Sequence, residues 1–339
     1  MAEDGGPEGD LLGRARAGDD LAFEELVRPY HRELQAHCYR ILGSVADAED
    51  AFQESLTAAW KGLAGFEGRA SFRTWLYRVA SGRSLNMVRA SRRSAASPTL
   101  IDLEPPEPTR SGEVLWLEPY PDAMLAEVAD TTAGPEARYE QRESISLAFI
   151  AALQLLPPRQ RAALILTEVL DFSARDVADM LDTTEHAIYG AVKRARATLA
   201  RQLPEAEPPP LPNSLNERKV LDRLVRAWEE CDTNALVALL TDDAWLRMPP
   251  NPLEYQGKAT VERWFATIAF NEGRRFRLVP TRANGQAAFG VYLFSPISRV
   301  AHAFGLIVVT LAGDRVSAIT AFESGVMARF GLPRSVAAD

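Results

Sequence analysis

Two proline-rich breaks divide the chain and limit what it can fold into. Residues 94–137 contain seven prolines, and the run PEAEPPPLP at 204–212 contains five. Proline fixes φ and removes a backbone donor, so no regular helix or central strand is expected to cross these stretches. The first break, an acidic linker, has a composition that argues against a packed element, whereas the second predicts an extended, semi-rigid spacer. We expect folded domains at residues 10–93, 138–203 and 213–335.

The net charge of −8 lies in the first break, where nine acids face one base. Cys38 and Cys231 are far apart in the sequence, which favours buried thiols in a reducing compartment over a disulfide. The pattern implies no metal site. No apolar run approaches the ~18 residues of a membrane span, and the acidic amino terminus is unlike a secretory signal. We therefore expect a cytoplasmic protein with no membrane contact.

Residues 10–93 have the periodicity of amphipathic helices. Between residues 48 and 63, apolar side chains recur at intervals of three and four, and Asp47 is the expected N-cap. One face of this helix is predicted to be buried and the opposite face to be acidic.

Arginines and aromatic residues interleave in the next stretch. From Phe66 to Arg93 there are seven arginines against the single acid Glu67. Unpaired bases stack on aromatic and guanidinium planes, and the nucleic-acid backbone attracts cations, so this segment is typical of single-stranded DNA binding. An ordinary amphipathic helix is the alternative, and for Trp75 and Leu76 individually we favour a place in the core. The charge pattern itself favours phosphate.

A helix-turn-helix pattern covers residues 173–199. Ser173 and Asp176 form a start like a capping box, residues 182–184 form the turn and a new N-cap, and apolar residues then recur along one helical stripe. The early exposed residues are placed for base edges and the later ones for phosphates. A plain helical hairpin is the alternative. The exposed residues are Thr184, Glu185, His186, Tyr189, Lys193, Arg194 and Arg196.

The third domain changes from helical to strand periodicity. We expect helices at residues 215–228 and 261–271, followed by two hairpins that turn at Asn284-Gly285 and Gly313-Asp314. The predicted class is α+β with a curved antiparallel sheet.

These motifs together resemble a known family. The segments DAEDAFQESLTAAW at 47–60, FRTWLYRVA at 72–80 and LLPPRQRAAL at 155–164 are similar to those of extracytoplasmic-function sigma factors, over about residues 10–203. Residues 213–335 resemble the SnoaL-like domain fused to one subset of that family, as do WLEPYPD and the closing RFGLP. The resemblance implies two all-α sigma domains, regions two and four, and a C-terminal α+β SnoaL-like cone.

The resemblance also implies roles for individual residues, and hence a protein that directs transcription initiation with RNA polymerase core and promoter DNA as its partners. The residues that match the face for the β′ and β subunits of core are Asp47, Glu49, Asp50, Gln53 and Glu54. Those that match the minus-ten surface are Arg69, Ser71, Arg73, Trp75, Arg78, Arg83, Asn86 and Arg89. The exposed residues of the helix-turn-helix match the minus-35 surface. The sequence departs from the family at Gly82, Asn86 and Asp182.

The third domain is expected to regulate the sigma domains in cis, and its pocket to take an unknown small-molecule ligand. The candidate lining is nearly all apolar or aromatic, so we expect no enzyme and no cofactor. One alternative is a DNA-binding regulator fused to a SnoaL-like enzyme of the cyclase or isomerase type, and another is a free-standing helix-turn-helix regulator. The candidate pocket residues are Trp245, Met248, Tyr255, Trp264, Tyr292, His302, Phe304 and Phe322.

The segment WLEPYPDAML at 116–125 is unusually apolar for a linker. Large side chains can supply buried area, and the prolines lower the ordering cost of the free chain. We expect this segment to dock on the third domain; the alternative is a short helix start in a mobile tether. The expected anchors are Trp116, Leu117, Tyr120 and Met124.

Overall fold

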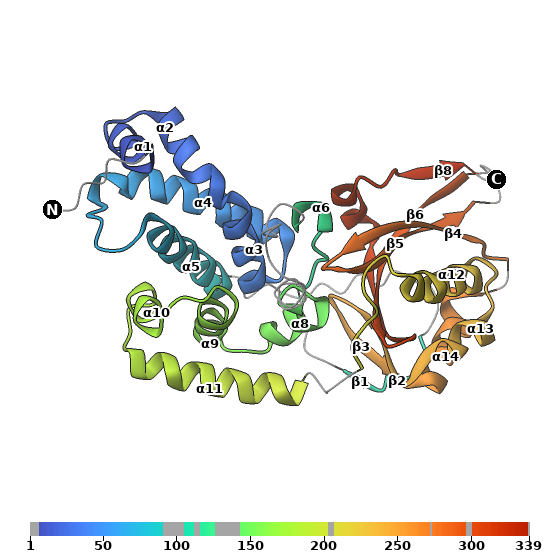
Figure 1. Ribbon diagram of the computed structural model, residues 1–339. Helices are drawn as coiled ribbons and strands as arrows, with labels where there is room; N and C mark the ends of the chain where they lie inside the picture. Colours follow the sequence, from blue (N-terminus) through green and yellow to red (C-terminus); the bar gives the residue numbers. More distant parts are fainter. Residues whose placement is uncertain are drawn as a thin grey trace. The chain divides into compact units, whose positions relative to one another are not determined.

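The computed structural model describes residues 7–90, 105–111, 116–125, 143–202, 207–271, 273–295 and 300–337. The chain divides into two compact units (Figure 1). The helical unit comprises Met1–Arg93, Met124–Ser144 and Ala148–Leu203, and the sheet unit comprises Ser94–Ala123, Ile145–Leu147 and Pro204–Asp339. Among the residues described, no helix has the length and apolar character needed to cross a membrane.

The first half of the helical unit is built from amphipathic helices with identifiable caps. The α4 helix begins one turn before the predicted N-cap, because the Ser44 hydroxyl accepts the Asp47 backbone N–H at 3.1 Å. Asp47 is therefore a first-turn residue whose charge favours the helix dipole, not the cap itself. The helices are α1 (Pro7–Arg16), α2 (Asp20–Val27), α3 (His31–Leu42), α4 (Val45–Gly62) and α5 (Phe72–Ala90).

The second half of the unit contains the predicted helix-turn-helix. Ser173 caps α10 and exchanges a further hydrogen bond with Asp176, and the Thr184 hydroxyl accepts the Ala187 N–H at the start of α11. Asp182 holds φ +48 in the turn. These features confirm the predicted caps and turn. The helices are α8 (Leu147–Gln154), α9 (Pro158–Leu164), α10 (Ala174–Met180) and α11 (Glu185–Gln202), with a π-helical turn, η3 (Ile165–Val169), after α9.

The two halves pack together in one unit. The Tyr77 ring on α5 meets the Phe172 ring edge-on at 5.1 Å, and the Arg73 guanidinium lies 4.8 Å from the Phe172 ring centre. The Arg161 guanidinium, buried to 4 % exposure, donates to the Ile41 carbonyl at the end of α3. Aromatic and charge-assisted contacts of this kind join α3 and α5 to the helices of the second half.

In the described part of the sheet unit, eight strands form one sheet in the order β1-β3-β2-β7-β6-β5-β4, with β8 paired to β6. All its pairs are antiparallel except β2 with β7. The strands are β1 (Arg110–Ser111), β2 (Leu240–Met248), β3 (Asn251–Gln256), β4 (Phe276–Ala283), β5 (Gln286–Phe294), β6 (Val300–Ala312), β7 (Arg315–Glu323) and β8 (Ser335–Ala337).

Three helices pack on one face of this sheet (Figure 1). They are α12 (Leu215–Glu229), α13 (Thr233–Ala238) and α14 (Lys258–Trp264), the last continued by the π-helical turn η4 (Phe265–Ala269). The core between helices and sheet is rich in aromatic side chains, including Trp228, Phe265 and Phe276. An α+β domain beside all-α regions is the class expected from the sequence, and it is confirmed.

Both predicted hairpins are confirmed. Asn284 and Gly285 turn at φ +56 and +72 between β4 and β5, and Gly313, at φ +55, precedes β7. Positive φ at both central residues is the geometry that an Asn-Gly turn supplies. The sequence pattern missed α13, β2 and β3, whose apolar residues are too few and too irregularly spaced to show a period.

The expectation that residues 94–137 contain no packed element is wrong for the part that the structure describes. Arg110 and Ser111 form β1, which pairs antiparallel with Glu254 and Leu253 of β3. The strand is two residues long and lies at the sheet edge, where neighbouring prolines cost no ladder hydrogen bonds.

Candidate functional site

The acidic face of α4 presents the carboxylates that the sequence predicts. Asp50, Gln53 and Glu54 are exposed and lie on one side of the helix, while Ala51, Phe52 and Ser55 are buried on the other. Asp47 and Glu49 are half-buried next to this face. The Asp50 and Glu54 carboxylates make no ion pair with other described residues, so their charge is available to a partner.

The arginine face of α5 and the preceding loop is largely paired with acids. Arg69 bonds to Glu67 within the loop. Arg73 donates to Glu33 on α3 at 3.2 Å, and the Tyr77 hydroxyl donates to the same carboxylate oxygen at 3.0 Å. Residues 66–93 contain one acid and seven arginines. The fold brings a further acid to this face, Glu33 of α3.

A second acid reaches this face from the helix-turn-helix. Arg78 pairs with Asp182 in the turn at 2.9 Å, and both side chains are more than half exposed. Arg83 and Asn86 are also exposed and have no side-chain partner in the part of the chain that is described. The side chain of Arg89 and all of Arg92 and Arg93 lie outside the described residues.

Two predicted minus-ten residues have structural roles. The Ser71 hydroxyl accepts the Thr74 N–H at 3.0 Å and caps α5. Trp75 is half-buried against Phe66 and Phe72, with ring centres at 5.2 and 5.7 Å. Leu76 is buried, as favoured from the sequence.

Every residue predicted for the minus-35 surface is exposed, on α11 or at its cap, Thr184. Tyr189 is 63 % exposed, and Ile188, Val192 and Ala195 are buried on the opposite stripe. Arg196 differs from its neighbours because it forms a bidentate pair with Glu168, with donor–acceptor distances of 2.6 to 3.1 Å. Lys193, Arg194 and Arg201 have no acidic partner among the residues described, so α11 offers three cations beyond its first turn that no acid pairs.

The linker segment at 116–123 is held on the β4–β5 hairpin of the sheet unit. Tyr120 is fully buried; its N–H donates to the Asn284 side-chain oxygen at 2.8 Å, and its carbonyl accepts the Asn284 N–H at 2.9 Å. The Asp122 carboxylate accepts the Gly285 N–H at 2.7 Å and lies 3.5 Å from the Arg282 guanidinium. The Asn284 side chain and the backbone N–H groups of the Asn284-Gly285 turn thus all hydrogen-bond to the segment.

The same hairpin also holds residues 145–147, where α8 begins. The Asn284 side-chain amide donates to the Ile145 carbonyl at 2.8 Å, and the Leu147 N–H donates to the Gln286 side-chain oxygen at 3.0 Å. We call Asn284 with these partners the hairpin clamp. Sequence reasoning identified Asn284 only as a turn residue, because nothing in the local pattern shows which distant backbone groups it will meet.

The four expected linker anchors differ in their surroundings. Leu117 and Tyr120 are buried, Trp116 is 41 % exposed, and Met124 is half-buried in α6 (Asp122–Leu125) and is grouped with the helical unit. The stronger hold comes from hydrogen bonds that the apolar pattern did not indicate, at Tyr120 and Asp122.

The pocket predicted from aromatic residues of the third domain is not formed by them. Tyr255 and Trp264 belong to the core, and Tyr292 faces away from it, since successive strand residues alternate and Val291 and Leu293 point inward. The other five are dispersed along the strands. Trp245 lies between the Arg110 and Arg247 guanidinium groups, Met248 packs on the core, Phe322 is buried, and His302 and Phe304 are exposed.

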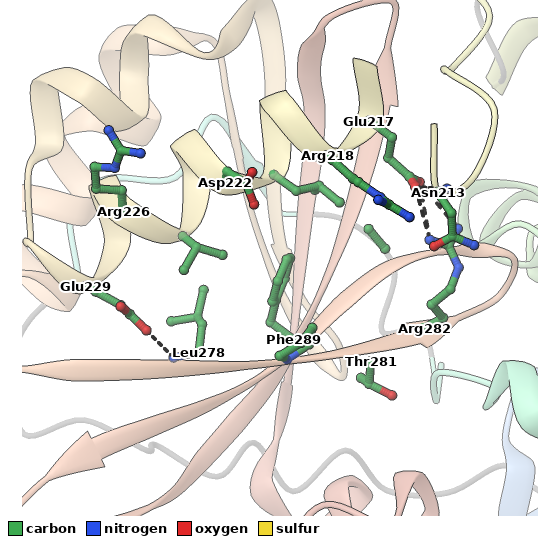
Figure 2. Close-up of a pocket in the computed structure, with 14 residues that line it drawn as sticks. Asn213, Glu217, Arg218, Asp222, Arg226, Glu229, Leu278, Thr281, Arg282 and Phe289 are labelled. Atoms are coloured by element: carbon green, nitrogen blue, oxygen red, sulfur yellow. Dashed lines mark hydrogen bonds and ion pairs between the residues drawn. The ribbon is translucent and has the colours of Figure 1, made fainter. Parts of the chain in front are cut away.

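A groove of about 790 Å³ lies instead between α12 and the β4–β5 strands (Figure 2). Leu278 and Phe289 form its floor, and Arg218, Asp222 and Arg226 come from the exposed side of α12. At one end the buried Glu217 carboxylate pairs with Arg282 at 3.3 Å, and at the other the Glu229 carboxylate accepts the Leu278 N–H at 2.9 Å. None of the eight predicted pocket residues lines this groove.

Two buried groups of the helical unit have shifted pKa values. Burial lowers the pKa of His37 to about 3, and the nearby positive charge of Arg40 acts in the same direction. Burial raises the pKa of the Cys38 thiol to about 11, so this cysteine is a protonated core residue. The described residues contain no cluster of three or more His, Cys, Asp or Glu side chains able to hold a metal ion.

Three protein families match successive parts of the sequence. Sigma-70 region 2 matches residues 26–94, Sigma-70 region 4 matches residues 146–199, and the SnoaL-like domain matches residues 221–320. The crystal structure of the Mycobacterium tuberculosis extracytoplasmic function sigma factor SigJ is similar in fold, with a TM-score of 0.55 and 23% identity. That alignment covers 86% of this chain and 93% of SigJ.

Two relatives match in sequence. The ECF RNA polymerase sigma factor SigM of Mycobacterium tuberculosis H37Rv is 32% identical over 196 residues, covering 58% of this chain and 84% of SigM. The ECF RNA polymerase sigma factor SigG of the same strain is 40% identical over 331 residues, covering 95% of this chain and 86% of SigG. The chain thus belongs to the ECF RNA polymerase sigma factors, which direct transcription initiation, and it carries a C-terminal SnoaL-like domain.

Proposed function

We propose that this sigma factor docks on RNA polymerase core through the acidic face of α4, contacts promoter DNA through α5 and α11, and is regulated in cis by its SnoaL-like domain. The observation that carries the proposal is the separation of unpaired acids and exposed cations onto different helices of the helical unit. Promoter phosphates repel Asp50 and Glu54, whereas Lys193 and Arg194 attract them. Two partners of opposite charge therefore meet two different surfaces.

Promoter contact divides between the two regions. His186 and Tyr189 are exposed near the start of α11, which supports contact with base edges in the major groove, and the exposed Lys193 further along supports contact with phosphate. On α5, Arg83 and Asn86 are available as they stand, while Arg78 must exchange Asp182 for phosphate.

This exchange implies an opening of the helical unit. The minus-ten and minus-35 elements lie about two turns of DNA apart, roughly 70 Å at about 34–36 Å per turn. Glu185 at the start of α11 is only three residues from Asp182, which contacts α5 directly. One surface cannot reach both elements while that contact persists, so we assign the compact unit to a resting state.

The hairpin clamp gives the SnoaL-like domain a means of control. It holds the middle of the linker through Tyr120 and the start of region 4 through Ile145. Both segments lie between the two sigma regions in the chain, so holding them shortens the tether on which region 4 must move. The clamp therefore favours the resting state without a separate inhibitor protein.

A SnoaL-like enzyme with a DNA-binding arm is the second candidate function. That reading needs an acid or base beside a substrate pocket. His302 is exposed on β6 and does not line the groove, and two of the three carboxylates that do are engaged, because Glu217 pairs with Arg282 and Glu229 accepts the Leu278 N–H. We therefore favour regulation over catalysis for this domain.

Core binding tests the assignment of the acidic face. Replacing Asp50→Lys together with Glu54→Lys should weaken binding to core RNA polymerase at least 100-fold, about 2.7 kcal/mol, and abolish run-off transcription. The matched control is Glu230→Lys with Glu262→Lys, which makes the same charge change at exposed positions of the sheet unit. Equal affinity of both variants for core contradicts the proposal.

Clamp variants test regulation. Asn284→Gly keeps a residue suited to positive φ but removes both side-chain hydrogen bonds of the clamp. We expect faster chymotrypsin cleavage after Trp116, since the bond after Tyr120 precedes Pro121 and resists the enzyme, and several-fold more run-off transcript from the full chain with core. Asn213→Gly, also at positive φ but outside the clamp, is the control. Faster cleavage with unchanged transcription would separate docking from regulation and refute the latter.

A further inference from the structure

We propose that the groove between α12 and the β4–β5 strands binds an elongated apolar monoanion, and that Arg282 transmits this binding to the linker. The site is distinct from the aromatic interior of the domain. Its effect on transcription rests on the cis regulation proposed above, whereas binding itself does not.

The groove has the size and floor of a small-molecule site. Its volume of about 790 Å³ is within the range of roughly 300–1,000 Å³ common for ligand pockets. Leu278 and Phe289 form the floor (Figure 2), and Leu221 and Val225 of α12 also line the groove. Apolar side chains along the length of the groove suit a hydrocarbon or aromatic body.

A peptide strand does not fit this groove. An added strand needs the outward N–H and C=O groups of the edge strand β4. Pro280 on β4 has no N–H, and the Leu278 N–H already donates to Glu229 at 2.9 Å. The edge of β4 therefore lacks two consecutive backbone donors that an added strand would need. A small molecule recognised by side chains remains as the occupant.

The charged side chains indicate which end of the groove binds the anionic group of the ligand. Figure 2 shows the Arg218 and Arg282 guanidinium groups at the end near Asn213. Arg218 has no acidic partner among the described residues, so it can receive an anion without breaking a pair. Asp222 points over the middle of the floor (Figure 2), where it repels a second negative group. A single anionic head on an apolar body matches this arrangement.

Arg282 connects the groove to the clamp. Besides Glu217 at 3.3 Å, it lies 3.5 Å from Asp122 of the linker segment and donates to the Gly285 carbonyl at 3.1 Å. A ligand carboxylate at Arg282 competes with Asp122 for the same guanidinium. Binding should therefore loosen the linker segment, which is the direction that favours opening.

Titration calorimetry on the full chain tests the site with three probes of equal length: sodium decanoate, decylamine and 1-decanol, each below its micelle concentration. Decanoate should bind at least 10-fold more tightly than the other two. Arg218→Met should weaken decanoate binding at least 10-fold. Arg226→Met, whose guanidinium points away from Phe289 in Figure 2, should change it less than 2-fold. Circular dichroism checks that both variants are folded.

No decanoate binding, equal binding of the three probes, or equal loss in the two variants overturns the site. The coupling is tested by chymotrypsin cleavage after Trp116 of the linker segment, which decanoate should accelerate at least 3-fold in the wild type and not in Arg218→Met. Unchanged cleavage at saturating decanoate overturns the coupling. If both results hold but Asn284→Gly leaves run-off transcription unchanged, the cis regulation fails while the ligand site stands.

Discussion

The acidic face of α4 and the arginine face of α5 look equivalent in the sequence, but the fold treats them differently. Asp50 and Glu54 on α4 are exposed and unpaired among the described residues. Arg69, Arg73 and Arg78 each have a carboxylate partner. A charged face is therefore not in itself an available one. The face that we propose for polymerase carries unpaired acids, whereas much of the face that we propose for DNA is paired with internal acids.

The largest expected difference in stability comes from removing one carboxylate from each face: Glu33, which pairs with the arginine face, and Glu54, which is exposed on the acidic face. Glu33→Ala should lower the free energy of unfolding by about 2 kcal/mol, because it leaves the buried Tyr77 hydroxyl without this acceptor and Arg73 without its counter-charge. Glu54→Ala should change it by less than about 0.5 kcal/mol. Urea denaturation of the two variants measures both. Similar losses would mean that the α4 acids are also structural.

The free energy of unfolding should depend on pH through a buried histidine of the helical unit. His37 of α3 bonds to Ser81 of α5 at 2.8 Å, and its folded pKa of about 3 is below the ordinary 6.5. The unfolded chain therefore takes up a proton first as pH falls, so this stability is present above about pH 6.5 and is lost towards pH 3. Between pH 6.5 and 5 the loss is about 2 kcal/mol.

Thermal or urea denaturation across this pH range checks the effect. His37→Gln should remove that part of the pH dependence, whereas His186→Gln, at an exposed position of α11, should leave it unchanged. An unaltered pH profile in His37→Gln would assign the effect to other groups.

The cations of α11 should differ in how much each contributes to the salt dependence of promoter binding, according to whether an acid already pairs with them. Lys193→Ala should reduce the slope of log K against log salt by about 0.9, the value for one phosphate contact, when the holoenzyme binds promoter DNA. Arg196→Ala should reduce it less, because its guanidinium is held by Glu168. Fluorescence anisotropy at several salt concentrations measures the slopes. A larger change for Arg196 would show that DNA breaks the Glu168 pair.

The smallest effect is expected at the contact between α5 and the helix-turn-helix. Asp182→Asn keeps a residue that tolerates φ +48 but removes the charge that faces Arg78. Because the pair is exposed, stability should change by less than about 1 kcal/mol. Binding of single-stranded minus-ten DNA should tighten about 2-fold, with Asp179→Asn on α10 as the control. Weaker binding would mean that Asp182 orders the DNA-facing surface.

Features set by neighbouring residues were predictable from the sequence. The Asn284-Gly285 and Gly313-Asp314 turns, the caps at Ser173 and Thr184, and the buried stripe of α11 all follow from local geometry. Prediction failed where contacts are distant. The Asp47 cap was wrong because Ser44 is equally suited and precedes it, and the aromatic pocket was wrong because composition does not say on which face of a strand a side chain points.

The sequence by itself determined the longer amphipathic helices, the β4–β5 and β6–β7 hairpins and the sign of each charged face, because dihedral preference and periodicity act over a few residues. Only the tertiary structure decided which charges are free and which distant segments are held. Glu33 neutralises Arg73 and Asn284 binds Tyr120 across 40 and 164 positions of the chain. Such pairings depend on the packing of whole elements. A hydrogen bond contributes more to the stability of the fold where that packing excludes water.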